Sequence, residues 1–230
     1  MRRAAGRYRK LALGRRAVFP AHGKAPAGAG ERGLSEDFPL AGARTLYGAT
    51  KLASELLIEE YAQMHGFRYV IDRCGVIAGP WQMGKTDQGF ALLWLARHRW
   101  KQPLSYTGFG GQGKQVRDVL HVDDLCDLVL FQLNDMDRVN GRVMNAGGGA
   151  ANADTLRGFT ERCAALTGNR IHVGSDPADR PGDLKLYVTD NTRVTALTGW
   201  SPKRSIDVLL QDSLAWLRQH EDRLRVILAP

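Results

Sequence analysis

The sequence has few cysteines and no long apolar run, and both absences narrow the class of protein it encodes. Its three cysteines, Cys74, Cys126 and Cys163, stand far apart and form no Cys-x-x-Cys pair. A disulfide framework or a zinc site therefore does not fit, and we expect a reducing cytoplasm. No apolar stretch approaches the roughly 18 residues that cross a bilayer, so we expect no membrane partner.

Acidic residues are missing from the first thirty positions, and this explains the net charge of +8. Every charged residue before Glu31 is basic, whereas the rest of the chain is electrically balanced. A basic arm suits contacts with phosphates. This one lacks a recognition motif and interleaved aromatic residues, so we expect no nucleic-acid partner.

Three segments differ in texture. Residues 1–33 are rich in Arg, Ala and Gly and have no period, which indicates an irregular basic leader that is disordered or misassigned. Residues 34–220 carry the periodic patterns of a folded protein, and residues 221–230 are expected to be a tail.

The pattern of residues 34–220 predicts alternating helices and strands. Apolar residues at helical spacing predict a helix over 46–65, ended by Gly66, and an apolar β-rich run predicts a buried strand over 67–74. Asp123 or Asp124 is the expected cap of a helix that runs to about residue 133. Further helices are expected at 90–98, 153–167 and 205–219, and extended segments at 104–106, 114–121 and 143–145. This alternation favours an α/β fold.

The sharpest chemical signal is Tyr47-Gly48-Ala49-Thr50-Lys51. Residues four apart at a helix start lie on one face, so the phenol and the amine can converge. An ammonium beside a phenol favours the phenolate, which can then take a proton from a sugar hydroxyl. The same spacing also occurs by chance on many helices.

Several motifs follow this pair in a fixed order. They are Arg73-Cys74-Gly75-Val76-Ile77-Ala78-Gly79-Pro80, Gly113-Lys114-Gln115-Val116-Arg117-Asp118, His121-Val122-Asp123-Asp124, Asn145-Ala146-Gly147-Gly148-Gly149 and Arg180-Pro181-Gly182-Asp183. Together with Tyr47 and Lys51 they resemble the extended short-chain dehydrogenase/reductase family, also known as the NAD-dependent epimerase/dehydratase family. The resemblance covers about residues 34 to 220.

The resemblance implies a fold and a set of site residues. It implies the carboxyl-terminal part of a Rossmann-like parallel sheet, with a small α+β substrate-binding domain. Tyr47 and Lys51 would be catalytic and would also bind NAD, beside Cys74 and Val76. The substrate-binding residues would be Gln82, Gln88, Arg117, Arg180 and Asp183. Guanidinium groups suit phosphate oxygens, although Asp118 and Asp183 are alternative ion-pair partners for the two arginines.

Two patterns suggest sites that we reject. Gly108-x-Gly110-x-x-Gly113 matches the dinucleotide fingerprint, but the residues after it alternate like a strand and provide no helix N-terminus for a pyrophosphate. We expect a hairpin turn there instead. His121 with Asp123 suggests a metal, but a capped helix explains both residues and no third ligand is evident, so we expect no metal.

The resemblance also shows what the sequence lacks. The family opens with a strand, a Gly-rich turn and a helix that bind NAD, and no such pattern precedes Leu34. The family's Ser or Thr near the catalytic pair falls on Arg15, if Val18-Phe19-Pro20 marks the corresponding strand. We therefore expect a start that is truncated, misassigned or decayed, and weak NAD binding by the 230-residue chain.

Loops at 79–84 and 113–118 most resemble family members that act on CDP-sugars. The expected function is thus NAD-dependent epimerisation of a CDP-sugar at C2 through a transient keto form. A related reductase or dehydratase, or a non-catalytic nucleotide-binding fragment, stays open as an alternative. The apolar residues of the first helix could pair two copies into a homodimer or be buried in the core.

Overall fold

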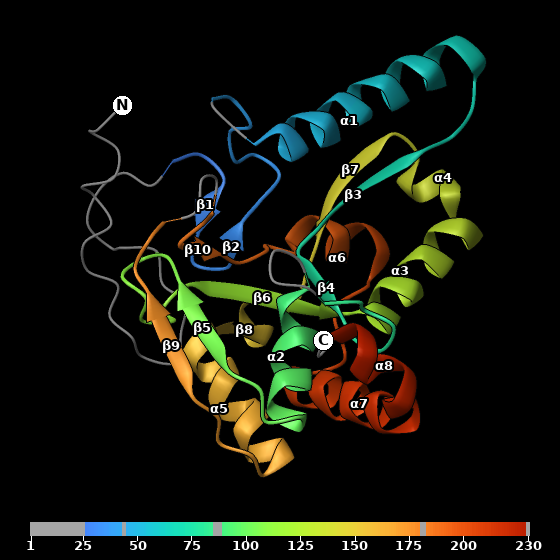
Figure 1. Ribbon diagram of the computed structural model, residues 1–230. Coiled ribbons are helices and arrows are strands. Elements are labelled where there is room, and N and C mark those ends of the chain that lie inside the picture. The colour runs from blue at the N-terminus through green and yellow to red at the C-terminus, as the bar shows by residue number, and fades with distance from the viewer. Residues whose placement is uncertain (1–25, 43–44, 85–88, 180–182, 229–230) are drawn as a thin grey trace.

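The computed structural model describes residues 26–42, 45–84, 89–179 and 183–228. Over these residues it is an α/β fold with parallel strand pairs and flanking helices (Figure 1). In chain order the elements are β1 (Ala29–Gly30), β2 (Gly33–Leu34), α1 (Leu46–His65), β3 (Val70–Cys74), β4 (Val76–Ala78), α2 (Phe90–Arg99), β5 (Leu104–Thr107), β6 (Val116–His121), α3 (Val122–Asn134), α4 (Met136–Val139), β7 (Arg142–Ala146), η2 (Ala150–Asn152), β8 (Ala153–Thr155), α5 (Leu156–Thr167), β9 (Val173–Asp176), β10 (Leu186–Tyr187), α6 (Thr192–Thr198), α7 (Ile206–Gln219) and α8 (Glu221–Leu228).

Strand β6 is the centre of the largest sheet. It pairs in parallel with β4 and β10 and antiparallel with β8. Its last four residues, 118–121, are buried, as expected of a central strand covered on both faces. The pairs β3–β7 and β5–β9 are also parallel. The expected Rossmann-like parallel arrangement is confirmed.

The chain changes its pairing partner at Gly75, between β3 and β4. The Gly75 N–H donates to the Ala146 carbonyl at 2.9 Å, whereas Val76 already pairs with β6. A Cβ at Gly75 would lie 3.0 Å from Thr189 Oγ1, and one at Gly147 only 2.1 Å from the same atom. A side chain at Gly147 would therefore clash with Thr189, whereas one at Gly75 would require only a small shift of the Thr189 hydroxyl.

Helix α1 follows the predicted bounds and has clear ends. Thr45 caps it by accepting from the Gly48 N–H at 3.1 Å, and Gly66 ends it in the left-handed conformation at φ 71°. Only Ala62 is buried among its residues. Figure 1 shows α1 lying away from the group formed by α2, α5, α7 and α8. Its exposed large apolar residues are Leu46, Tyr47, Leu56, Leu57, Ile58, Tyr61 and Met64.

Two apolar clusters form the core. The larger joins α2, α5, α7 and α8 to β4 and β6, and the smaller joins α3 and α6 to β6 and β7. The expected tail at 221–230 is wrong, because α8 occupies 221–228 and buries Leu224 and Leu228, four residues apart on one face. None of the described helices combines the length and apolarity that a membrane span requires.

The hairpin expected around 108–113 is also wrong. Strand β5, before the glycine turn, pairs in parallel with the distant β9, whereas β6, after the turn, pairs with β4, β8 and β10. The Gly108 N–H donates to the Asp176 carbonyl at 2.8 Å, so the turn itself is held by the end of β9. Local spacing could not reveal a partner about seventy residues away.

Regular structure begins earlier than the expected boundary at residue 34. Strands β1 and β2 form a short antiparallel ladder across that boundary. Leu34 lies against the rest of the sheet: its N–H donates to the Val188 carbonyl at 2.8 Å, and its carbonyl accepts from the Asp190 N–H at 3.0 Å. The irregular leader is therefore wrong for 29–33. Residues 1–25 lie outside the described residues.

Candidate functional site

The predicted catalytic pair lies on the first two turns of α1. Tyr47 and Lys51 face the same side, with Lys51 Nζ 5.5 Å from the centroid of the Tyr47 ring. That distance is within the range of a cation–π contact. Tyr47 is 65% exposed, and Lys51 is exposed as well. The convergence expected from the spacing is thus present, on an open surface.

An ion pair ties this helix to the sheet. Arg73 of β3 donates from Nε to Glu55 Oε1 at 3.0 Å and from Nη2 to Glu55 Oε2 at 2.7 Å, a two-pronged arrangement. The hydrogen bonds to Glu55 raise the pKa of Arg73 above its usual value. Glu55 lies one turn after Lys51, so the pair fixes the start of α1 relative to β3.

Cys74 and Val76 flank the change of partner at Gly75. Burial, together with the nearby Asp72 carboxylate, raises the pKa of Cys74 to about 11, so its thiol is a poor nucleophile at neutral pH. Val76 lines the cavity described next. Neither side chain carries a charge at neutral pH, and their contact with NAD stays a prediction.

A cavity of about 540 Å³ lies among α2, β5, β6 and the start of α5. Its size is typical of a small-molecule site. One part of its wall is aromatic: Phe90 contacts Phe159 edge to face at 5.4 Å, and Trp94 donates to Thr160 Oγ1 at 2.9 Å. The residues with ionisable or amide side chains in the wall are Arg97, Gln115, Arg117, Asp154 and Asp183.

Arg117 and Asp183, both predicted to bind substrate, lie together in this cavity. Arg117 Nη2 donates to Asp183 Oδ1 at 2.7 Å, and its Nη1 donates to the Val116 carbonyl at 2.7 Å. Burial lowers the pKa of Arg117 from its usual value, and the Asp183 carboxylate opposes that shift. A phosphate that reaches the guanidinium therefore competes with Asp183.

Gln82 performs a structural task in the loop before α2. Its Nε2 donates to the Ile77 carbonyl at 2.6 Å, and its Oε1 accepts from the Leu92 N–H at 3.2 Å. Gly89 offers α2 no side-chain cap, so Gln82 satisfies one of the free N–H groups of the first turn. Its role toward a substrate stays a prediction. Gln88 and Arg180 lie outside the described residues.

The residues of α2 that line the cavity were not predicted as site residues. Phe90, Trp94 and Arg97 follow one another at spacings of four and three, which places them on one helical face. That signal was visible in the sequence. What could not be seen was that β5 and α5 would lie opposite this face.

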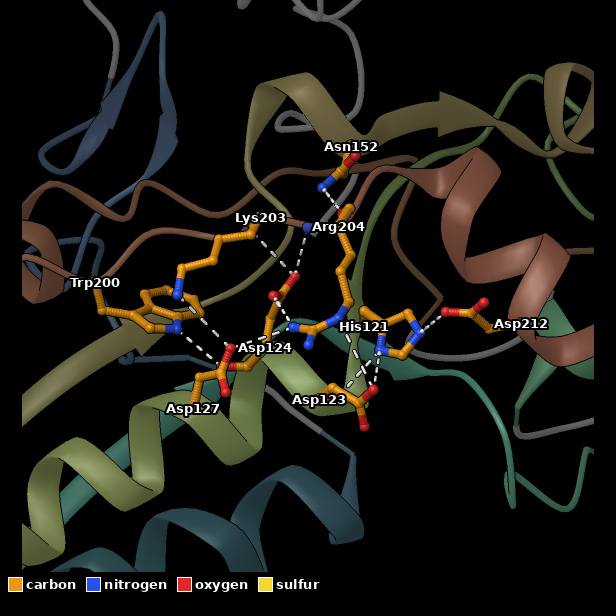
Figure 2. A network of polar contacts seen from close by, with 9 residues as sticks. All are labelled: His121, Asp123, Asp124, Asp127, Asn152, Trp200, Lys203, Arg204 and Asp212. Carbon is orange, nitrogen blue, oxygen red and sulfur yellow. Dashed lines mark hydrogen bonds and ion pairs between the residues drawn. The ribbon is translucent and has the colours of Figure 1, made fainter.

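His121 and the acidic residues after it form a structural junction, shown in Figure 2. His121 Nδ1 accepts from the Asp123 N–H at 3.1 Å, so the imidazole caps α3 in place of the expected Asp123 or Asp124. Asp124 instead receives Arg204 Nη1 at 2.6 Å, and Asp212 lies 3.3 Å from His121 Nε2. These contacts join α3 and α7 to the loop before α7.

The fold and the motifs of this chain are shared with known proteins. The model of the NAD dependent epimerase/dehydratase family matches residues 3–147. The chain belongs to this family. Among curated relatives, CDP-paratose 2-epimerase of Salmonella typhi is 27% identical over 176 residues, 74% of this chain and 51% of the relative. UDP-glucose 4-epimerase of Azospirillum brasilense is 30% identical, over 80% of this chain and 56% of the relative.

A dTDP-glucose 4,6-dehydratase of Actinoplanes sp. is 31% identical over 80% of this chain and 54% of the relative. The chain thus spans about half the length of the curated relatives it matches. A solved structure, UDP-glucuronic acid 4-epimerase from Bacillus cereus in complex with UDP-glucuronic acid and NAD, is 25% identical with a TM-score of 0.71. It aligns with 84% of this chain and 59% of that one. Membership of an NAD-dependent family of enzymes confirms the resemblance.

Proposed function

We propose that this epimerase/dehydratase family member serves the C2 epimerisation of a CDP-sugar. The observation that carries the proposal is the convergence of Lys51 Nζ and the Tyr47 ring at the start of α1. Similarity to CDP-paratose 2-epimerase supports the choice of reaction and of nucleotide.

Tyr47 is the proposed base and Lys51 its electrostatic partner. The ammonium stabilises a phenolate, which takes the proton of the sugar hydroxyl. NAD, when bound, would supply the reversible hydride acceptor that oxidation to a keto sugar and its reduction on the other face require. Tyr47 then returns the proton to the sugar oxygen, so the net change is inversion of configuration at one carbon.

The described residues fit one end of NAD. The phenol and amine of α1, together with Cys74 at the end of β3 and Val76 at the start of β4, are proposed to hold the nicotinamide end. For the pyrophosphate, the glycine turn at 108–113 does not serve, because strand β6 follows it rather than a helix. The residues proposed here for NAD are therefore Tyr47, Lys51, Cys74 and Val76.

The cavity between α2 and β6 is the proposed nucleotide site. Arg117 is proposed to contact the diphosphate after Asp183 moves to a ribose hydroxyl. Arg180 and Gln88 are proposed as further substrate contacts, with Gln82 bracing the loop that leads to Gln88. Clamping the unreactive nucleotide would position the sugar near Tyr47.

Two other proposals concern the setting of the enzyme. The exposed apolar residues of α1 are proposed to pack against a second copy of the chain, because so many large apolar side chains on one helix are costly to leave in water. Cys74, Cys126 and Cys163 are all unpaired, which supports a reducing cytoplasm.

A second function has one observation in its favour. The walls of the cavity come from α2, β5, β6 and α5, so nucleotide binding needs no residue of α1. A chain that binds a nucleotide without catalysis is therefore the alternative. A dehydratase remains a third reading, supported by the 31% identity with the Actinoplanes enzyme.

The test is a turnover assay of CDP-sugars with NAD, followed by NMR of the sugar products. We expect Tyr47→Phe to lower turnover at least about 100-fold, because general base catalysis contributes on that scale. Tyr61→Phe is the matched control, since Tyr61 is an exposed tyrosine on the same helix, and it should leave turnover unchanged. The assay is run on this chain and on any longer product of its reading frame.

The outcomes separate the three readings. Loss of an oxygen function from the sugar instead of inversion would support a dehydratase and overturn the epimerase. Binding of CDP without turnover in either form of the protein would support the non-catalytic alternative. Full turnover by Tyr47→Phe would remove the phenol from the mechanism.

A further inference from the structure

Arg97 is a half-buried cation in the wall of the cavity, and the described part of the chain places no opposite charge beside it. It lies in the last turn of α2, and its Nη1 donates to the neutral Gln102 Oε1 at 2.5 Å. Among the described residues no carboxylate lies within ion-pair distance of it. A guanidinium that is partly removed from water and not neutralised is costly to keep.

The other charges in the cavity wall are all compensated. Arg117 pairs with Asp183 at 2.7 Å, and Asp154 pairs with Arg162 at 2.8 Å. Over the residues that the structure describes, Arg97 is therefore the charged group of this wall that has no ion-pair partner. Its side chain offers several N–H donors in a flat fork, of which Gln102 takes one.

The surroundings of Arg97 suit a flat, partly apolar group. Trp94 lies one turn before it on the same helix, and Pro103 and Leu104 follow α2 and line the same cavity. Such a wall accommodates the faces of a nucleobase, while the guanidinium can reach the polar edge of the ring. A phosphate would meet few other donors in this apolar part of the wall.

We infer that Arg97 reads the edge of the base and selects cytosine among the pyrimidines. The inference rests on the proposed function and names the residue that chooses its nucleotide. Cytosine carries two adjacent acceptors, O2 and N3, which match two parallel N–H donors of a guanidinium. Uracil and thymine carry an N3–H donor at that position, so one N–H of the fork would face another donor.

An alternative explanation is that Arg97 only complements the negative end of the α2 dipole. Arg218 provides the matched control, because it is an exposed arginine in the last turn of α7 and lies outside the cavity. Lysine keeps the positive charge at either position and removes the two-pronged fork. Replacement of each arginine by lysine therefore separates charge from edge recognition.

The experiment is calorimetric titration of the 230-residue chain with CDP, UDP, dTDP, GDP and inorganic pyrophosphate. We expect the unchanged protein to bind CDP about tenfold more tightly than UDP or dTDP. Arg97→Lys should remove most of that preference, chiefly by weakening CDP, whereas Arg218→Lys should leave it intact. Thermal unfolding of both variants checks that each is folded as the parent is.

Each contrary result has a distinct meaning. An unchanged CDP preference in Arg97→Lys, or equal affinity of the parent for the three pyrimidine nucleotides, overturns the inference and leaves the proposed function standing. Equal weakening of all ligands, pyrophosphate included, makes Arg97 a phosphate contact and also overturns it. Preferred binding of GDP, whose base offers O6 and N7 to the same fork, overturns the choice of cytosine. Failure of every nucleotide to bind would defeat the nucleotide-sugar function itself.

Discussion

Helix α1 and the cavity side of the molecule are built in opposite ways. Of the twenty residues of α1, Ala62 alone is buried, and the Arg73–Glu55 pair fixes the helix to β3. Helix α2, at half that length, buries seven residues, Ala91, Leu92, Leu93, Trp94, Leu95, Ala96 and His98. The proposed proton-transfer pair therefore lies on a helix that is hardly buried, whereas the proposed ligand cavity is lined by a helix that is mostly buried.

The two halves of the proposed site, helix α1 and the cavity lined by α2, therefore depend on different forces. Buried apolar area holds the cavity wall in one shape, whereas directional hydrogen bonds to one carboxylate hold helix α1. Changes that remove apolar volume should affect the first half, and changes that remove charge should affect the second.

The largest expected effect is on the cavity side. Phe159 is 1% exposed and packs against Phe90, so Phe159→Ala should lower the free energy of unfolding by about 3–5 kcal/mol. Gln63→Ala on α1 is the control, and because Gln63 is an exposed polar residue its effect should stay within about 0.5 kcal/mol. Urea unfolding measures both. Similar losses in the two variants would contradict the contrast.

A smaller effect is expected from the tether of α1. Glu55→Gln keeps the shape of the side chain and removes the charge-assisted bonds to Arg73, at a cost of about 1–2 kcal/mol. The loss should be local, with faster amide hydrogen exchange along α1 and little change in α2. Glu60→Gln, on an exposed residue of the same helix, should leave exchange unaltered. Uniform exchange rates across all three proteins would show that Glu55 is not the tether.

The smallest effect is a pH dependence within the sheet. Asp118 is fully buried, and desolvation raises its pKa although the Gly149 and Thr189 N–H groups donate to it. A folded pKa above the unfolded one means that ionised Asp118 opposes folding above both values. As the pH falls through the folded pKa, protonation relieves this cost, which is gone below the unfolded pKa of about 3.9.

Asp118→Asn should therefore gain stability relative to the parent near about pH 7, and the gain should shrink as the pH falls toward about 4. Asparagine keeps an acceptor for the two N–H groups and removes the buried charge. Paired urea titrations at several pH values measure the difference. A difference that is constant with pH would mean that Asp118 is not the titrating group.

Local patterns carried much of the fold, for reasons that particular residues make clear. Helical spacing and Gly66 were enough to define α1, because caps and periodicity act within a few residues. The pairing of β5 with β9 depends on contacts about seventy residues apart, which no local period encodes. The His121 cap was missed because aspartate caps helices more commonly than histidine does. The side chains of Asp123 and Asp124 form ion pairs with Arg204 instead.

The candidate site was predictable only in part. Tyr47 and Lys51 share a helix, so spacing alone predicted that they meet. Asp183 was named as a possible ion-pair partner for Arg117 or Arg180, and it pairs with Arg117, but the cavity that they share with α2 depends on tertiary packing. Arg97 belongs to no motif, and its distance from the carboxylates of the described segments becomes visible only once the helix is packed.

Residues 73–76, around the change of strand partner at Gly75, connect the cavity to the ion pair that holds helix α1. Val76 lines the cavity, and Arg73 binds the Glu55 carboxylate of helix α1. Only Gly75 and Cys74 stand between them along the backbone. Three peptide bonds, with Gly75 among the residues they join, therefore separate the cavity wall from the ion pair that holds α1. A ligand that displaced Val76 would transmit its displacement to Arg73 along this short stretch of backbone.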